Sequence, residues 1–144
     1  MKSFSILLIT VFAFAFLQQK DSWVIYLDKK IIHRGTENPV KDKIPVVVLA
    51  KTALKPASVL KIVYKQSPSS VEWKSNFVFT NTRDSTLLQF DFDKSSGDFS
   101  IPVSAFLTHL KKEKKLMLFA DQHPKNDALM IRSKRVLLCN IQLK

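Results

Sequence analysis

The sequence contains little glycine, and this shortage excludes several kinds of active site. Only two glycines occur among 144 residues, Gly35 and Gly97. Nucleotide-binding loops need clustered glycines to bring backbone amides up to phosphate groups, so neither the dinucleotide nor the ATP form of such a loop can be built here. The Gly-x-Ser-x-Gly elbow of many hydrolases is also absent. We therefore expect no cofactor, find no catalytic motif and interpret the chain as non-enzymatic.

Cysteine is even scarcer, because Cys139 is the only one. A single cysteine cannot form a disulfide within the chain. A nucleophile needs an electropositive, partly exposed thiol with a base nearby, whereas Cys139 lies in an apolar segment, residues 135–143, in phase with Leu137, Ile141 and Leu143. We predict a small core residue in a terminal strand, and an intermolecular disulfide is the alternative.

Only one long apolar run is present, at residues 4–17, after Lys2. It has about 14 residues, fewer than the roughly 20 that span a bilayer as a helix. This layout predicts a signal peptide over residues 1–15, with cleavage after Ala15 or up to residue 19, and an uncleaved anchor is the alternative. The expected product is one domain, residues 16–144, that is not transmembrane after cleavage and is periplasmic or extracellular.

Acidic residues are few, since 12 Asp and Glu face 23 Lys and Arg, for a formal net charge of +11. Lysine provides 19 of these cations, which suits diffuse attraction to anions better than the bidentate readout of bases by arginine. Because export is expected, anionic envelope material or a protein is a better partner than nucleic acid. The predicted anion-binding surface comprises Lys61, Lys65, Lys111, Lys112, Lys114 and Lys115. The alternative is that these lysines only keep the surface soluble.

Short segments with alternating or β-branched apolar residues follow the apolar run. They lie at residues 22–28, 31–34, 44–50, 58–66, 72–80, 86–93, 116–120 and 135–143, with a return near 99–101 and a doubtful strand at 128–132. One helix is expected after Pro102, because Val103, Phe106, Leu107 and Leu110 share a face. We predict an all-β fold, a single antiparallel, immunoglobulin-like β-sandwich of about seven or eight strands with one short helix. A small β-barrel is the alternative.

Side chains suited to metal binding or to ligand stacking also have ordinary structural uses. Asp121, His123 and Asp127 form the best metal constellation, in an expected loop at residues 121–127, but ordinary turn chemistry accounts for the same residue types. Asp91 and Asp93 are interpreted as solvated carboxylates of a strand rather than a catalytic pair. Trp23 and Trp73 are interpreted as core or rim residues rather than a platform for a sugar or peptide.

The two ends of the expected domain carry a recurring pattern. Trp23-x-x-Tyr26-Leu27-Asp28-x-Lys30 near its start, with Arg135-Val136-x-Leu138-Cys139 and Leu143-Lys144 at its end, resembles small uncharacterised exported bacterial proteins. The resemblance implies a secreted β-domain and no catalytic residues. The sequence thus predicts an exported binding module with a basic surface. A carrier of an apolar ligand between the sheets and a metal-dependent site at residues 121–127 are the alternatives.

Overall fold

A computed structural model describes residues 19–37 and 44–144. The expected signal peptide therefore lies outside the described residues. The strands are β1 (Ser22–Leu27), β2 (Lys30–Thr36), β3 (Val46–Leu49), β4 (Val59–Lys65), β5 (Trp73–Thr80), β6 (Thr86–Phe92), β7 (Gly97–Pro102), β8 (Lys115–Pro124) and β9 (Lys134–Leu143). The helix α2 (Val103–Glu113) joins β7 to β8, and the short 3-10 helix η2 (Lys51–Ala53) follows β3.

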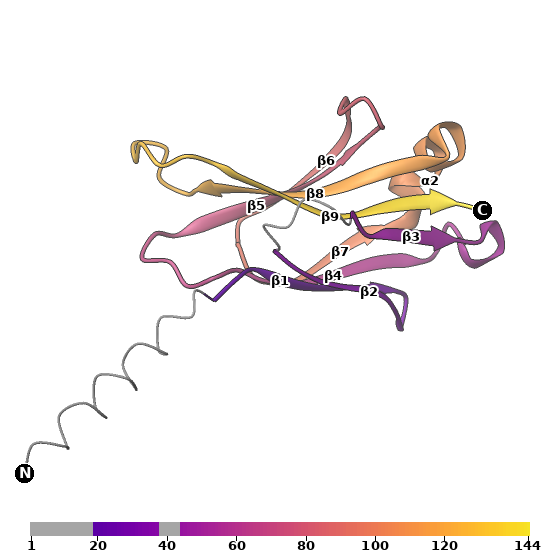
Figure 1. Cartoon of the computed structure of the whole chain (residues 1–144), viewed down its shortest axis with the longest axis horizontal. Coiled ribbons are helices and arrows are strands. Elements are labelled where there is room, and N and C mark those ends of the chain that lie inside the picture. The colour runs from indigo at the N-terminus through magenta and orange to yellow at the C-terminus, as the bar shows by residue number, and fades with distance from the viewer. Residues whose placement is uncertain (1–18, 38–43) are drawn as a thin grey trace, which may run out of the picture.

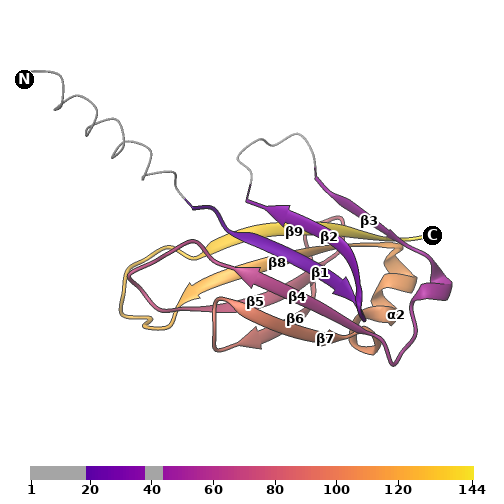
Figure 2. The same ribbon diagram turned by 90° about the horizontal axis from the view of Figure 1, so that it is seen from below.

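The strands form two sheets that pack face to face, which confirms the predicted β-sandwich (Figures 1 and 2). One sheet has the order β2-β1-β4-β7 and the other β3-β9-β8-β5-β6. The run β9-β8-β5-β6 matches strands G, F, C and C′ of an immunoglobulin sandwich, and the adjacent pair β4-β7 matches B and E. The two sheets remain separate layers in the described part of the chain, as expected of a sandwich rather than a barrel.

One pairing differs from the purely antiparallel arrangement that we predicted. β3 runs parallel to β9, with Val46 opposite Asn140 and Leu49 opposite Leu143. β2, the strand before it in the chain, belongs to the other sheet and pairs antiparallel with β1. Local alternation specifies a strand but not its direction relative to a distant neighbour, and the sequence pattern therefore could not show this pairing.

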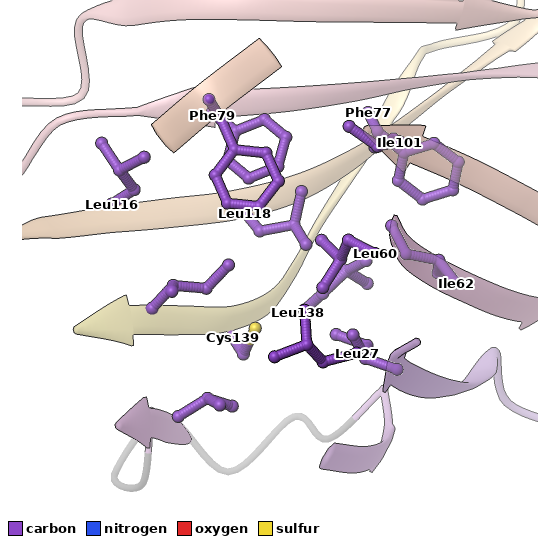
Figure 3. Close-up of a cluster of buried hydrophobic side chains, with 14 of the residues drawn as sticks. Leu27, Leu60, Ile62, Phe77, Phe79, Ile101, Leu116, Leu118, Leu138 and Cys139 are labelled. Carbon is purple, nitrogen blue, oxygen red and sulfur yellow. The ribbon is translucent and has the colours of Figure 1, made fainter. Parts of the chain in front are cut away.

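The core is made by the alternating inward positions of both sheets. Ile25, Leu60, Ile62, Phe77 and Phe99 are completely buried, as the period-two patterns predict. Phe77 on β5 and Phe99 on β7 meet across the sandwich with ring centroids 4.8 Å apart. Figure 3 shows side chains from both sheets, including Leu27 and Leu60, in the same cluster as Leu138 and Cys139. Side chains of the two layers thus contact each other directly between the sheets.

A β-bulge changes the phase of β9. Leu118 of β8 pairs with Cys139, but the next residue, Phe119, pairs with Leu137, so Leu138 is the extra residue. Cys139 and Ile141 are buried as expected, whereas Leu137 is only half-buried and Leu138 takes the inward position. The prediction that Leu137 shares the inward face of Cys139 was wrong for this reason.

Three other boundaries differ from the sequence prediction. The helix extends from Val103 to Glu113, with Pro102 as its N-cap, and is longer than the two turns that its apolar spacing indicates. Asp121 and His123 lie within β8 rather than in a loop, since this strand continues to Pro124. The doubtful strand at residues 128–132 does not form.

Candidate functional site

Several turns and chain ends meet at one end of the sandwich, on the right in Figure 1. The N–H of Leu143 donates to the carbonyl of Lys114 (2.9 Å), and the N–H of Lys144 donates to the carbonyl of Leu49 (2.9 Å). The N–H of Lys51 donates to the carbonyl of Lys144 (3.3 Å). These backbone bonds bring the end of α2, the end of β9 and η2 together. The β1-β2 turn lies at the same end (Figure 2).

The β1-β2 turn is attached to this end by Asp28. The backbone of Asp28 lies in the left-handed region (φ 54°), which aspartate tolerates better than most residues. The N–H of Asp28 donates to the carbonyl of Val59 (2.8 Å), while its carboxylate accepts from the N–H of Val59 and the hydroxyl of Ser58, both at 2.9 Å. The two hydrogen bonds that the carboxylate accepts lower the pKa of Asp28, and the bond from the Val59 amide has the larger effect. Its carboxylate is therefore already engaged by β4.

The chain segments at this end of the sandwich, which we call the lysine end, are rich in lysine. The lysine end consists of Lys29, Lys30, Lys51, Lys55, Lys111, Lys112, Lys114, Lys115 and Lys144. All are exposed except Lys115, which is half-buried. Within the described residues, none of them forms an ion pair with a carboxylate. The lysine end is therefore a concentration of like charge that protein carboxylates do not neutralise by direct pairing.

The helix α2 explains where part of this charge lies. Lys111 and Lys112 occupy its last turn, where the helix dipole favours cations. Lys114 caps the helix in the left-handed conformation (φ 63°), and its N–H donates to the carbonyl of Leu110 (2.9 Å). The dipole accounts for the lysines of the helix but not for Lys29, Lys51 and Lys55, which come from other elements.

The six lysines of the predicted basic surface do not all lie at the lysine end. The structure brings Lys111, Lys112, Lys114 and Lys115 together but places Lys61 and Lys65 elsewhere. Lys61 pairs with Asp98 across β4 and β7 (2.7 Å), and this hydrogen bond raises the pKa of Lys61. Lys65 ends β4 at the far end of the sandwich, opposite Ser22. Lys29, Lys30, Lys51, Lys55 and Lys144 were missed, because only the tertiary structure brings their turns together.

The far end of the sandwich carries paired charges instead. Asp21 is completely buried there and accepts from the hydroxyl of Tyr64 (2.5 Å) and from the N–H of Ser67 (2.7 Å). Lys134 approaches both Asp21 (3.2 Å) and Glu37 (2.7 Å). Burial alone would raise the pKa of Asp21, but the hydrogen bonds lower it below the ordinary value. This network holds the start of β1 to β4 and β9.

The three candidate metal ligands have separate surroundings. Arg135 binds Asp121 through two hydrogen bonds, from Nε to Oδ1 (2.7 Å) and from Nη2 to Oδ2 (2.8 Å). His123 contacts Ser133 through Nδ1 (2.9 Å), and Asp127 lies in the turn after β8. Among residues 19–37 and 44–144, no group of three His, Cys, Asp or Glu side chains is arranged to hold a metal ion.

The two tryptophans have different environments. Trp23 is buried and stacks on Tyr64, with ring centroids 6.1 Å apart, as the core interpretation predicts. Trp73 is half-buried at the rim, where its indole N–H donates to the hydroxyl of Ser69 (2.9 Å). It borders an open, shallow hollow of about 430 Å³ that is also lined by Lys94 and Lys125. The indole thus takes part in local structure at that rim.

Cys139 is completely buried, which confirms its prediction as a core residue. Burial raises the pKa of its thiol to about 12, so the thiolate is scarce at neutral pH. No base or cation contributes to this shift. The thiol therefore lacks the setting of a nucleophile and packs as a small apolar side chain.

These features define an all-β sandwich with an immunoglobulin-like strand order and one end rich in lysine. No protein-family model, curated protein or solved structure matches the chain. Among the residues that the structure describes, no helix has both the length and the apolar character required to cross a membrane.

Proposed function

We propose that this protein is an exported, non-enzymatic binding module that attaches to an anionic partner through its lysine end. The observation that carries the proposal is the convergence on one end of nine lysines from four stretches of the chain, residues 29–30, 51–55, 111–115 and 144, without ion pairs among the described residues. An anionic surface of envelope material or protein would supply the missing counter-charge. Such a field also accelerates encounter with anions at low ionic strength.

The position of β1 supports this interpretation. β1 begins at the far end of the sandwich, while α2 and the C-terminus lie at the lysine end (Figure 1). A chain held or exported by its N-terminal segment would therefore present the lysine end away from that attachment. The paired charges around Asp21 and Lys134 are at the opposite end, so the charge asymmetry gives the domain one orientation toward an anion.

The proposal is tested by comparing two variants with the same net charge. In the first, Lys29, Lys111, Lys112 and Lys144 at the lysine end are changed to Gln. In the control, four other exposed cations, Lys20, Arg34, Lys65 and Arg132, are changed to Gln. Because each lysine near an anionic surface contributes on the order of 1 kcal/mol, the first variant should bind at least about 10-fold more weakly than the control.

Binding is measured by co-sedimentation with vesicles containing phosphatidylglycerol, and by retention on the acidic polysaccharide heparin and on a polyglutamate column. The wild-type protein should bind at least one of these probes at low salt and release it as salt rises toward roughly 0.5 M, since screening removes such attraction. Equal weakening in both variants would show that only net charge matters. That result, or no binding at low salt, would refute the lysine end as a binding site.

A further inference from the structure

The second feature that indicates a partner is the outer edge of β3. This strand ends the five-stranded sheet, and among the described strands it pairs with β9 alone. The N–H of Asn140 donates to the carbonyl of Pro45 (2.8 Å), and the N–H of Lys144 donates to the carbonyl of Leu49 (2.9 Å). Because alternate residues of a strand direct their peptide groups to opposite sides, Val46 and Val48 direct theirs away from β9.

Edge strands of natural sheets usually carry charges or other features that prevent further pairing. The other edges of this sandwich follow that rule: β2 has Lys30 and Arg34, β6 has Asp91, and β7 has Asp98. β3 and the residues beside it, Ile44 to Ala50, contain no charged side chain. In the described part of the chain, β3 is thus the one edge that lacks charged protection.

The outward side chains of β3 are apolar as well. Val47 and Leu49 point into the core, whereas Val46 and Val48 are 48% and 54% exposed. Ile44, in the same phase just before the strand, is 54% exposed. A strand with an apolar outward row, whose outward peptide groups pair with no other described strand, is the surface to which an extended segment adds in β-strand addition, where main-chain hydrogen bonds provide affinity.

Charge decides which occupant fits this edge. Lys51 begins η2, two residues after Leu49 ends β3, and the N–H of Lys144 donates to the carbonyl of Leu49, so β3 ends at the lysine end. A second copy of this chain would carry the same positive formal net charge, +11 over the whole sequence. An acidic partner would instead be attracted, and like-charge juxtaposition would disfavour self-pairing.

We propose that β3 accepts an extended segment of a partner protein as a sixth strand of this sheet, with acidic residues of that segment facing Lys51 and Lys144. The alternate apolar side chains of the segment would cover Val46 and Val48, while its backbone pairs with theirs. The inference rests on the proposed function, because the lysine end supplies the charge selection. It also specifies the partner as a protein with an extended, acidic-flanked segment.

The test uses three fluorescent synthetic peptides and the purified full-length protein. The first peptide is Asp-Glu-Thr-Val-Thr-Val-Thr-Val-Asp-Glu, which carries acids at both ends because the direction of the added strand is open. The second has N-methyl groups on alternate backbone amides, and the third has lysines in place of the acids. Binding is followed by fluorescence anisotropy. Protein variants are Val48→Pro, Val48→Lys and, as the matched control on another edge, the exposed Ile31→Lys.

The acidic-flanked peptide should bind, and N-methylation should weaken it at least about 10-fold by removing main-chain donors. Val48→Pro deletes the outward N–H but no bond to β9, and proline is tolerated on edge strands, so the fold should persist. Val48→Lys keeps the amide and adds charge to the outward face, so it provides a second variant if Val48→Pro fails to fold. Both should weaken binding at least about 10-fold, whereas Ile31→Lys should not.

Three results would overturn strand addition: no binding of the acidic-flanked peptide, equal binding of the N-methylated peptide, or binding that is insensitive to Val48. A concentration-dependent dimer that Val48→Lys dissolves would assign the edge to self-association instead. If the lysine-flanked peptide binds as well as the acidic one and still needs Val48, the proposed anion-binding function is refuted but strand addition to β3 is supported. If binding needs the lysine end but not Val48, strand addition to β3 is refuted and the proposed function is retained.

Discussion

At the scale of single residues, Asp21 shows how a buried charge is accommodated. Its carboxylate is completely buried, yet Tyr64, the Ser67 amide and Lys134 satisfy it. A buried carboxylate without such partners would be neutralised or strongly destabilising. The sequence showed only a polar residue after the expected signal peptide and before an alternating strand. Its burial follows from the way β4 and β9 close over it.

Changing Tyr64 to Phe should destabilise the protein by about 2 kcal/mol at pH 7, because the variant removes a hydrogen bond to a charged group. The folded-state pKa of Asp21 is lowered, so its contribution is present above the unfolded value near 4 and is lost as pH falls. The pKa of Tyr64 is raised, first by burial, so its contribution is present below the unfolded value near 10 and is lost at higher pH.

Urea unfolding of wild type and Tyr64→Phe at several pH values measures this difference. The gap in the free energy of unfolding should be widest between about pH 5 and 9 and should narrow on both sides. Tyr26→Phe is the control, because the side chain of Tyr26 lies on the outward face of β1 and is only half-buried. A gap that stays constant down to pH 2 would contradict the role of the Asp21 carboxylate.

Cys139 shows the opposite case, in which the sequence pattern predicted the burial of the residue correctly but placed the nearby Leu137 on the wrong face. Its apolar surroundings within β9 predicted burial, and the thiol is inaccessible in the core. Leu137, two residues earlier, was predicted to share the inward face of Cys139, but its side chain is only half-buried. A single extra residue at Leu138 reverses the alternation, and nothing in residues 135–143 indicates the place of that bulge.

At the scale of elements, the β1-β2 hairpin depends on a glycine for space rather than for backbone conformation. A Cβ on Gly35 would lie 2.5 Å from the indole of Trp23, its partner across the hairpin. No atom can occupy that position without a shift of the indole. Trp23 in turn is fixed by its stack on Tyr64. The glycine therefore lets β2 cover the tryptophan closely.

Gly35→Ala should accordingly destabilise the protein by about 1 to 3 kcal/mol, the usual cost of overpacking a core. Thermal or urea unfolding measures the effect, and tryptophan fluorescence should report a moved indole. Thr36→Ala, at the exposed next position of β2, is the control and should change stability little. Equal stabilities of the two variants would show that the hairpin can move apart from Trp23 without cost.

At the scale of the whole molecule, positive charge is distributed unevenly between the two ends. Several cations of the far end pair with acids, such as Lys134 with Asp21 and Arg135 with Asp121, whereas Lys65 there forms no ion pair with a described carboxylate. The lysine end has no such pairs among the described residues. Unpaired like charges repel and destabilise the folded state, most strongly at low ionic strength. Repulsion at the lysine end should thus lower the stability of the free protein, and under the proposed function an anionic partner would relieve it.

The variant with Lys29, Lys111, Lys112 and Lys144 changed to Gln should therefore be more stable than wild type at low salt. An expected gain of about 1 kcal/mol corresponds to roughly 4 °C in Tm for a domain of this size. Differential scanning calorimetry should show the gain fading near 1 M salt, where screening acts over about 3 Å. The control with Lys20, Arg34, Lys65 and Arg132 changed should gain less. An equal gain would contradict local repulsion at the lysine end.

The sequence by itself determined the residues that form strands, most of their inward faces, the helix after Pro102 and the burial of Cys139. These properties depend on periodicities of two and 3.6 residues, which a short segment carries without its neighbours. Only the tertiary structure decided the parallel pairing of β3 with β9, the bulge at Leu138 and the extension of β8 through Asp121. It also separated Lys61 and Lys65 from the lysine end and brought five unforeseen lysines to it. These features depend on which distant segments of the chain pack together, and the periodicity of a short segment does not specify its distant partners.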